Sequence, residues 1–209
     1  MARKDKGTKD LFLQKALELF AERGYKAVSV AQIAAEVGCT APALYKHYQS
    51  KKDLFDAILE ASNKGYEESM EKVHVNYDKH SEERESLIGM TEKEQVDTLK
   101  TLFLHTLTDE WAKAFRKLLM VEQFHMPELA EIYNERYVYA QIRRHEVLFK
   151  VLIEEGVVRE ADPGALAVTY ISPIIVLIGV CDRDGSKIDW ALETIEKHVK
   201  EFNRAYRMK

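Results

Sequence analysis

Residues 29–54, SVAQIAAEVGCTAPALYKHYQSKKDL, decide the fold, because several helix starts and one helix stop follow one another there. Ser29 precedes an apolar run and Gln32 stands three residues later, which is the spacing of a capping box. Gly38 follows the last apolar residue of the run, where a helix end calls for a residue at positive φ. The pattern predicts a short helix that begins after Ser29 and stops at Gly38.

A second short helix is predicted directly after the turn. Thr40 is expected as its N-cap, and Pro42 falls in its first turn, where a missing backbone N–H costs little. Leu44 and Tyr48 are four residues apart and are expected to face inward, which leaves the side chains between them pointing outward. A further capping box at residues 50–53 begins a longer helix. Two short helices joined by a tight turn predict a helix-turn-helix, whose second helix is shaped to enter a DNA major groove.

The sequence around this motif resembles the DNA-binding head of the TetR family of bacterial transcriptional regulators. The resemblance rests on ALELFAERGY at residues 16–25, SVAQIAAEVG at residues 29–38 and ALYKHYQSKKDLF at residues 43–55. Hydrophobic, glycine, tyrosine and lysine positions agree in spacing, except that Tyr48 stands where the family usually has phenylalanine. The rest of the chain is similar to the family only in length and helical character.

Composition favours an all-helical protein, and its charge is distributed unevenly along the chain. Nine glycines and four prolines are few for 209 residues, and 32 % of the residues are charged. The net charge is −4, but residues 1–60 hold ten Lys and Arg against eight Asp and Glu. Residues 61–209 hold twenty-one against twenty-seven, so a basic head would precede an acidic body, as suits a protein that approaches DNA with one end.

Cysteine usage and the apolar runs indicate a cytoplasmic protein without a membrane segment. Cys39 and Cys181 lie far apart and form no ligand motif, which is typical of a reducing cytosol. The N-terminus is polar and charged, unlike a signal peptide. The longest apolar run, residues 171–180, is about half the length that spans a bilayer. Either cysteine could sense redox state, although small packing residues are the simpler interpretation.

Helical periodicity continues along the chain and predicts about nine helices in total. A polar arm at residues 1–7 is expected to precede a first helix that Thr8 caps and Gly24 ends. Residues 73–90 have the weakest periodicity and predict a loop with room for one short helix. Further helices are predicted from Thr91, at residues 109–124, from Pro127 to about Glu155, from Pro163, and at residues 189–206. The faces expected to be buried include Leu102, Phe124 and Trp190.

The resemblance implies three parts: a helix-turn-helix DNA-binding domain at residues 1–49, a connecting helix at 50–72, and a ligand-binding and dimerisation domain at 73–209. The helix from Pro163 (ALAVTYISPIIVLIGV) is apolar almost all round, so the core or a second subunit must cover it. We therefore expect a homodimer that pairs through the last two or three helices. Its symmetry would require a near-palindromic operator with recognition helices about one DNA turn, roughly 34–36 Å, apart or a multiple of it.

The resemblance also assigns the DNA contacts. Tyr45 and Lys51 are implied as phosphate clamps, and Lys46 and His47 could reach phosphates or bases from the exposed side. The N-terminal end of the recognition helix, which meets base edges, holds Thr40, Ala41, Pro42 and Ala43, and Ser29 could donate to a phosphate. Because alanine and proline offer only apolar contact, specificity is expected from DNA shape and from the lysine or histidine.

In the body, the family's plan implies a cavity for a small-molecule effector among the middle helices. Aromatic, histidine and methionine residues are the candidates for its lining, although each alone is equally typical of ordinary core. The candidates are Phe103, His105, Trp111, Phe115, Met120, Phe124, Tyr133, Tyr137 and Tyr170.

Catalytic and metal sites find little support in the sequence. Glu122 and His125 form a Glu-x-x-His pair, but carboxylate-bridged metal sites need two such pairs. His74, Asp78 and His80 could touch one metal, although solvated surface histidines are the favoured interpretation. No nucleophile elbow, phosphate loop or zinc signature is present. The sequence therefore predicts no enzyme, no metal and no cofactor.

Together these patterns predict a ligand-responsive, homodimeric transcriptional regulator that resembles the TetR family and acts as a repressor on double-stranded DNA. An activator, or a regulator without a ligand, is the alternative within this class. A helical enzyme fused to a DNA-binding head and a membrane-associating helix at residues 163–181 are the alternatives from other classes.

Overall fold

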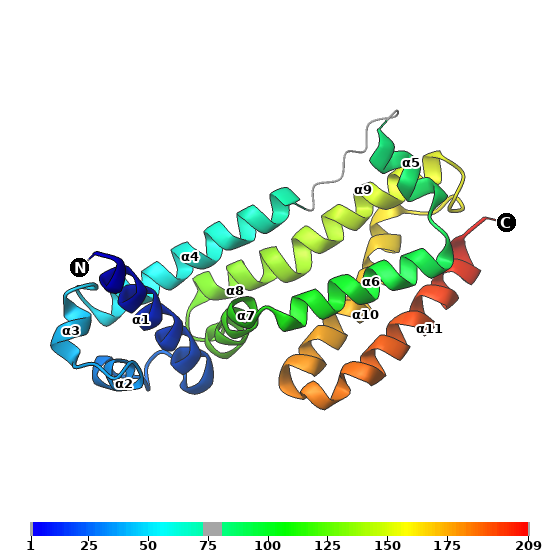
Figure 1. Ribbon diagram of the computed structural model, residues 1–209. Coiled ribbons are helices and arrows are strands. Elements are labelled where there is room, and N and C mark those ends of the chain that lie inside the picture. The colour runs from blue at the N-terminus through cyan, green and yellow to red at the C-terminus, as the bar shows by residue number, and fades with distance from the viewer. Residues whose placement is uncertain (1, 73–80, 209) are drawn as a thin grey trace. The chain divides into compact units, whose positions relative to one another are not determined.

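The computed structural model describes residues 2–72 and 81–208, which form helices and, within those ranges, no strand (Figure 1). The predicted all-helical class is confirmed. The helices are α1 (Ala2–Arg23), α2 (Val30–Glu36), α3 (Ala41–Tyr45), α4 (Lys51–Lys72), α5 (Glu82–Gly89), α6 (Glu92–Thr108), α7 (Glu110–Glu122), α8 (Pro127–Asn134), a π-helical turn (Glu135–Tyr139), α9 (Ala140–Glu154), α10 (Pro163–Arg183), a 3₁₀ turn (Gly185–Lys187) and α11 (Ile188–Tyr206).

The chain divides into two compact units, and each is described by itself. The first unit contains α1–α4, α7 and most of α8, and the second contains α5, α6, the π-helical turn, α9, α10 and α11. Thus α7, which begins at Glu110, belongs with the helix-turn-helix, whose second helix ends at Tyr45. The division into a DNA-binding domain, a connecting helix and a ligand-binding domain remains a prediction.

The beginning of α1 differs from the prediction. The helix starts at Ala2, so residues 2–7 form its first turns and not an extended arm, and Thr8 lies inside it rather than at its cap. Lysine and arginine are good helix formers, and the single Gly7 costs about 1 kcal/mol relative to alanine, so nothing in the segment stops a helix. The core of the first unit comprises Phe12, Ala16, Leu17 and Phe20 of α1, Ile33 and Ala34 of α2, Leu44 of α3, Leu54 and Ile58 of α4, and Phe115, Leu118 and Leu119 of α7.

Two capped helices open the second unit. In α6 the predicted box is present: the Glu94 N–H donates to Thr91 Oγ1 at 3.3 Å, and the Thr91 N–H donates to Glu94 Oε2 at 2.8 Å. The short helix predicted as an option within residues 73–90 is present as α5. Ser81 caps it by accepting the Arg84 N–H. Residues 73–80 of that stretch lie outside the described residues.

Two apolar clusters hold the second unit together. Residues of α6, α10 and α11 form one, and residues of α9, α10 and α11 form the other. Their buried members are Phe103, Leu107, Ile171, Ile174, Leu177, Cys181, Ala191 and Ile195 in the first, and Phe149, Leu152, Val158, Leu166, Ala167 and Phe202 in the second. A single antiparallel bridge between Val158 and Arg207 ties the turn after α9 to the end of α11.

Three residues expected in the core lie on the surface instead. Leu102 is 49 % exposed, Trp190 50 % and Phe124 87 %. Leu102 and Trp190 each precede a buried residue, Phe103 and Ala191, and adjacent helical positions differ by about 100° in direction. Phe124 comes after α7 has ended at Glu122, so helical spacing no longer places it.

Helix α10 is the longest apolar element among the residues described. Asp162 caps it as predicted by accepting the Ala165 N–H at 2.7 Å. With 21 residues and a mean hydropathy of 2.2 it is long and apolar enough to cross a bilayer, which the run of residues 171–180 did not reveal. A core helix of a soluble protein has the same length and composition. Only 33 % of its most apolar window is buried, and Val168 and Val176 are open to solvent.

Glu196 on α11 provides a test of how the second unit responds to acid. Its carboxylate accepts from Lys100 of α6 at 2.6 Å and from Lys200 at 2.7 Å, and these two bonds lower its pKa from 4.5 to about 2. Because the folded pKa lies below the unfolded one, this stabilisation is present above pH 4.5 and is lost as the pH falls towards about 2. We expect Glu196→Gln to make the thermal midpoint less dependent on pH across that window. Glu193→Gln, which removes a 73 % exposed carboxylate from the same helix, is the control.

Candidate nucleic-acid interface

Helix α2 forms as its capping residues predict. The Gln32 N–H donates to Ser29 Oγ at 3.3 Å, and the Ser29 N–H donates to Gln32 Oε1 at 2.7 Å. Ile33 and Ala34 face the core with 0 % and 1 % exposure. The turn that follows has Gly38 at φ +70°, as predicted for the helix stop. The Ser29 hydroxyl also donates to Gln32 Oε1 at 3.0 Å, so the predicted donation to a phosphate would have to replace that bond.

Helix α3 is only five residues long and depends on one buried side chain. Thr40 is its N-cap, but its hydroxyl makes no capping bond; the Ala43 N–H donates to the Thr40 backbone carbonyl at 2.9 Å instead. Leu44 is 0 % exposed and Tyr48 4 %, which confirms the inward face. The Tyr48 hydroxyl donates to the Lys9 carbonyl at 3.4 Å, and burial raises the pKa of Tyr48 to about 12.

The outer face of α3 presents most of the predicted DNA contacts to solvent. Tyr45 is 52 % exposed, and Lys46, Thr40 and Pro42 are also exposed. Ala41 and Ala43 are half-buried, so their methyl groups are only partly available. His47 is half-buried too, because its ring packs on Phe12 with the centroids 5.9 Å apart. Tyr45 at the end of α3 and Lys46 directly after it are therefore well placed to reach a nucleic acid.

Lys51 at the start of α4 has a partner that the sequence did not reveal. Its ammonium donates to the Tyr25 carbonyl at 2.8 Å and to the Val28 carbonyl at 2.9 Å, and it lies 4.2 Å from the centre of the Tyr25 ring. An ammonium has three donors, so these two bonds leave one N–H for the predicted phosphate contact. Lys51 therefore holds the turn between α1 and α2 in addition to any role on DNA.

The capping box at the start of α4 is shifted by one residue. The Asp53 N–H donates to Ser50 Oγ at 3.0 Å, as predicted. The Asp53 carboxylate accepts the Gln49 N–H at 2.8 Å, whereas the predicted box would use the Ser50 N–H. This arrangement satisfies the backbone donors that lead from α3 into α4 and sets the direction of α4.

Comparison with known proteins identifies this arrangement of helices. A sequence model described as bacterial regulatory proteins, tetR family, matches residues 12–58, which run from α1 into α4. The helix-turn-helix segment therefore carries the sequence signature of the TetR family. The regulator AcrR of Shigella flexneri is similar to this chain, with 29 % identity over 149 residues that cover 69 % of the chain and 61 % of AcrR. The chain thus matches less than two thirds of that relative's length.

Solved structures of TetR-family regulators share the fold of the whole chain. A regulator from Mesorhizobium loti MAFF303099 has a TM-score of 0.65 at 19 % identity and covers 98 % of each chain. The complex of SmeT with triclosan has a TM-score of 0.63 at 18 % identity, and covers 97 % of this chain and 93 % of SmeT. SmeT is the repressor of a Stenotrophomonas maltophilia multidrug efflux pump. At this identity, the likeness to both structures concerns the fold.

The nine residues predicted to line an effector cavity are divided between the two units of the chain. Trp111, Phe115, Met120 and Phe124 belong to the first unit, and Phe103, His105, Tyr133, Tyr137 and Tyr170 belong to the second. Phe103 and Phe115 are core residues, whereas His105 and Phe124 are exposed. Whether the nine residues share a cavity stays a prediction.

The partly buried aromatic candidates have specific neighbours. Trp111 Nε1 donates to Ser62 Oγ at 3.0 Å, within the first unit. Tyr133 and Tyr137 flank the start of the π-helical turn with their ring centroids 5.4 Å apart. Tyr170 packs edge-on against Phe149 and Phe202, and burial raises its pKa to about 12. π-Helical turns occur frequently at functional sites, which supports the tyrosine pair as effector contacts.

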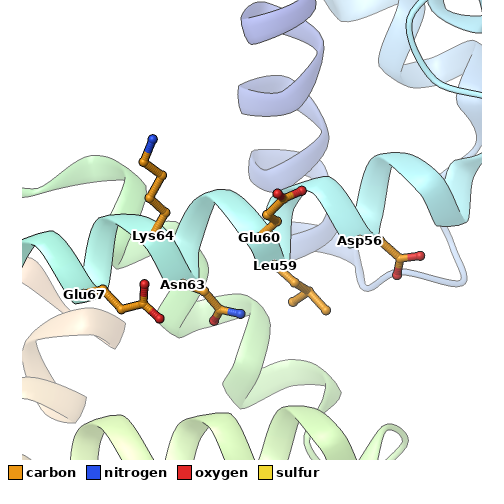
Figure 2. Close-up of a pocket in the computed structure, with 6 residues that line it drawn as sticks. All are labelled: Asp56, Leu59, Glu60, Asn63, Lys64 and Glu67. Carbon is orange, nitrogen blue, oxygen red and sulfur yellow. The ribbon is translucent and has the colours of Figure 1, made fainter.

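A surface hollow of about 650 Å³ runs along α4 in the first unit (Figure 2). Its lining residues all come from that one helix: Asp56, Leu59, Glu60, Asn63, Lys64 and Glu67. Three of these six side chains are carboxylates, and none of the six is a predicted effector contact. The hollow is therefore a different feature from the predicted cavity.

The residues considered for catalysis or metal binding do not converge where the structure describes them. Glu122 is 6 % exposed and accepts the Tyr25 N–H, whereas His125 is exposed. His74, Asp78 and His80 lie outside the described residues. No group of three or more potential metal ligands occurs in residues 2–72 and 81–208. Cys181 is buried, and burial raises the pKa of its thiol, with Asp182 and Asp184 adding to the effect; Cys39 is half-buried.

Proposed function

We propose that this chain is a sequence-specific DNA-binding transcriptional regulator of the TetR family that acts as a repressor. The observation that carries the proposal is the outer side of α3, where Tyr45 and the following Lys46 are exposed next to a helix fixed by buried Leu44. A recognition helix needs this combination of a rigid inner face and a polar outer face. SmeT, which shares the fold, is a repressor by name, and this supports the direction of regulation.

The working unit is a homodimer. Helix α10 is apolar almost all round, and only a third of its most apolar stretch is buried. Its exposed face includes Val168 and Val176, and a second copy of the chain would remove this apolar surface from water. Trp190 of α11, which is 50 % exposed, adds to that surface. Two-fold symmetry then requires a near-palindromic operator with half-sites about 34–36 Å apart, or a multiple of that distance.

A small-molecule effector releases the protein from its operator. The SmeT structure contains triclosan, which supports an organic effector for this fold. Its contacts in this chain are candidate residues of the second unit, with the Tyr133 and Tyr137 pair foremost. The effector favours a dimer geometry that does not match the operator spacing, so effector binding and DNA release are thermodynamically linked. The protein works in the cytoplasm, where its operator is, and it is not an enzyme.

Selection of duplexes from a random DNA pool by the purified protein, at two salt concentrations, tests this function. We expect two half-sites related by a two-fold axis, with affinity that falls steeply as salt rises. Recovery of single half-sites would contradict the dimer. Recovery of no preferred sequence by the folded protein would contradict the proposed function.

Tyr45→Phe tests the assignment of the phosphate contact. The substitution removes one hydroxyl from an exposed side chain, so we expect operator affinity to fall about five-fold on all duplexes alike. Because the hydroxyl is uncharged, the dependence of log K on log salt should keep its slope, whereas Lys46→Gln should reduce the slope by about 1 if Lys46 contacts a phosphate. Tyr139→Phe is the matched control, since Tyr139 is 51 % exposed and lies outside the helix-turn-helix. A changed base preference for Tyr45→Phe would refute the assignment.

A further inference from the structure

The end of α7 places a buried carboxylate against the turn between α1 and α2. Glu122 is the last residue of α7 and is only 6 % exposed. Its Oε1 accepts the backbone N–H of Tyr25 at 2.7 Å, although the two residues are 97 positions apart in the sequence. A buried carboxylate needs hydrogen-bond partners, so this bond is a specific link between α7 and the helix-turn-helix.

Gly24 makes room for this carboxylate. The residue has φ +83° and ends α1, with its N–H donating to the Phe20 carbonyl at 2.9 Å. A Cβ atom at this position would lie 2.9 Å from Glu122 Oε1, closer than real Cβ contacts. The glycine thus allows both the sharp turn and the close approach of α7.

The same turn is held from its other side by Lys51. The carbonyls of Tyr25 and Val28 accept from the Lys51 ammonium, which also lies over the Tyr25 ring. The backbone of Tyr25 therefore receives a carboxylate at its N–H and an ammonium at its C=O. One residue of the turn connects the end of α7 to the first residue of α4.

Packing along α7 makes this connection stiff. Phe115, Leu118 and Leu119 of α7 are at most 1 % exposed, and α7 packs against α1 in the first unit. A shift of α7 would therefore move the carboxylate together with the helix. The turn from Gly24 to Val28, and with it the position of the Lys51 ammonium, would follow.

We propose that Glu122 is a positioning residue for DNA binding, which fixes the Tyr25 turn and thereby the Lys51 ammonium and the start of α4. This inference rests on the proposed DNA-binding function. Glu122 itself touches no DNA in this scheme; it transmits the position of α7 to the head. The Glu-x-x-His pattern at Glu122 thus serves a connection between helices and not a metal site.

The test compares three variants in the full-length protein: Glu122→Ala, Glu122→Gln and Glu131→Ala. Glu131 is an exposed glutamate of α8 in the same unit and is the matched control. The readouts are the dissociation constant for the duplex that the wild type selects, corrected for the folded fraction, and the hydrogen exchange rate of the Tyr25 backbone amide. We expect Glu122→Ala to weaken operator binding about ten-fold and to accelerate exchange of the Tyr25 amide by a similar factor.

Glu122→Gln should stay within about two-fold of the wild type in both readouts, because its amide oxygen still accepts the Tyr25 N–H. The double variant Glu122→Ala with Lys51→Met should bind no more weakly than Lys51→Met alone, as expected for residues that act through one turn. Additive losses, or faster exchange with unchanged operator affinity, would overturn the positioning role. If the wild type selects no duplex, the proposed function fails; the exchange rate of the Tyr25 amide still shows whether Glu122 holds the turn.

Discussion

Gly24→Ala is expected to lower the free energy of unfolding by about 2–5 kcal/mol. An alanine at φ +83° pays about 1–2 kcal/mol for the left-handed conformation. Its methyl group would lie 2.9 Å from Glu122 Oε1 and would push the carboxylate off the Tyr25 N–H. The loss of that bond in a buried setting adds about 1–3 kcal/mol. Thermal unfolding should show a midpoint about 4–20 °C below that of the wild type.

Gly38→Ala is the matched control for this prediction. Gly38 has a similar φ of +70°, but nothing lies within 4 Å of the Cβ that alanine would add. It should therefore cost only the conformational part, about 1–2 kcal/mol. Equal losses in the two variants would mean that the carboxylate moves aside without penalty, so that the contact with Tyr25 carries little energy.

Leu44→Ala is expected to cost about 2–5 kcal/mol and to abolish operator binding at protein concentrations that saturate the wild type. Leu44 is 0 % exposed and is the one fully buried side chain of α3. A helix of five residues with no side-chain bond at its N-cap has little stability of its own, so α3 depends on this anchor. Chemical denaturation monitored by circular dichroism gives the loss of stability, and a binding titration gives the loss of affinity.

Leu11→Ala, in the same unit, removes the same atoms from a side chain that is 39 % exposed. We expect it to change stability by only about 0.5 kcal/mol and to leave operator binding intact. If Leu44→Ala retained full affinity, α3 would be held by other contacts, and the recognition face would not depend on the buried leucine.

The local features of the fold could be predicted because short-range chemistry determines them. The caps at Ser29, Thr91 and Asp162 and the stop at Gly38 each depend on residues within four positions. The outer face of α3 follows in the same way from the spacing of Leu44 and Tyr48, whose burial leaves Tyr45 exposed. The spacing of apolar residues determines which side of each helix is buried. Together with the caps, this is enough to predict a helix-turn-helix.

Contacts between distant segments could not be predicted from the sequence. The carboxylate of Glu122 accepts the N–H of Tyr25, which is 97 positions away in the sequence. The residues next to Glu122 give no sign of this bond, and its Glu-x-x-His pattern points to metal ligands as readily as to a contact between helices. Lys51 was assigned to phosphate by resemblance, and its bonds to two carbonyls depend on how the turn after α1 folds back. The start of α1 was misplaced because a charged segment can be an arm or a helix, and tertiary context decides.

The bond between Glu122 and Tyr25 bears on how such regulators can be recombined. A head cut from this chain after α4 would keep the side-chain caps at Ser29 and Ser50 but lose the acceptor for the Tyr25 N–H. The head is therefore not a self-contained cassette, and a chimera that joins it to a foreign body needs a carboxylate or amide at the position of Glu122. Gly24 and Glu122 form a matched pair in this respect, because a side chain at position 24 would occupy the space that the Glu122 carboxylate needs.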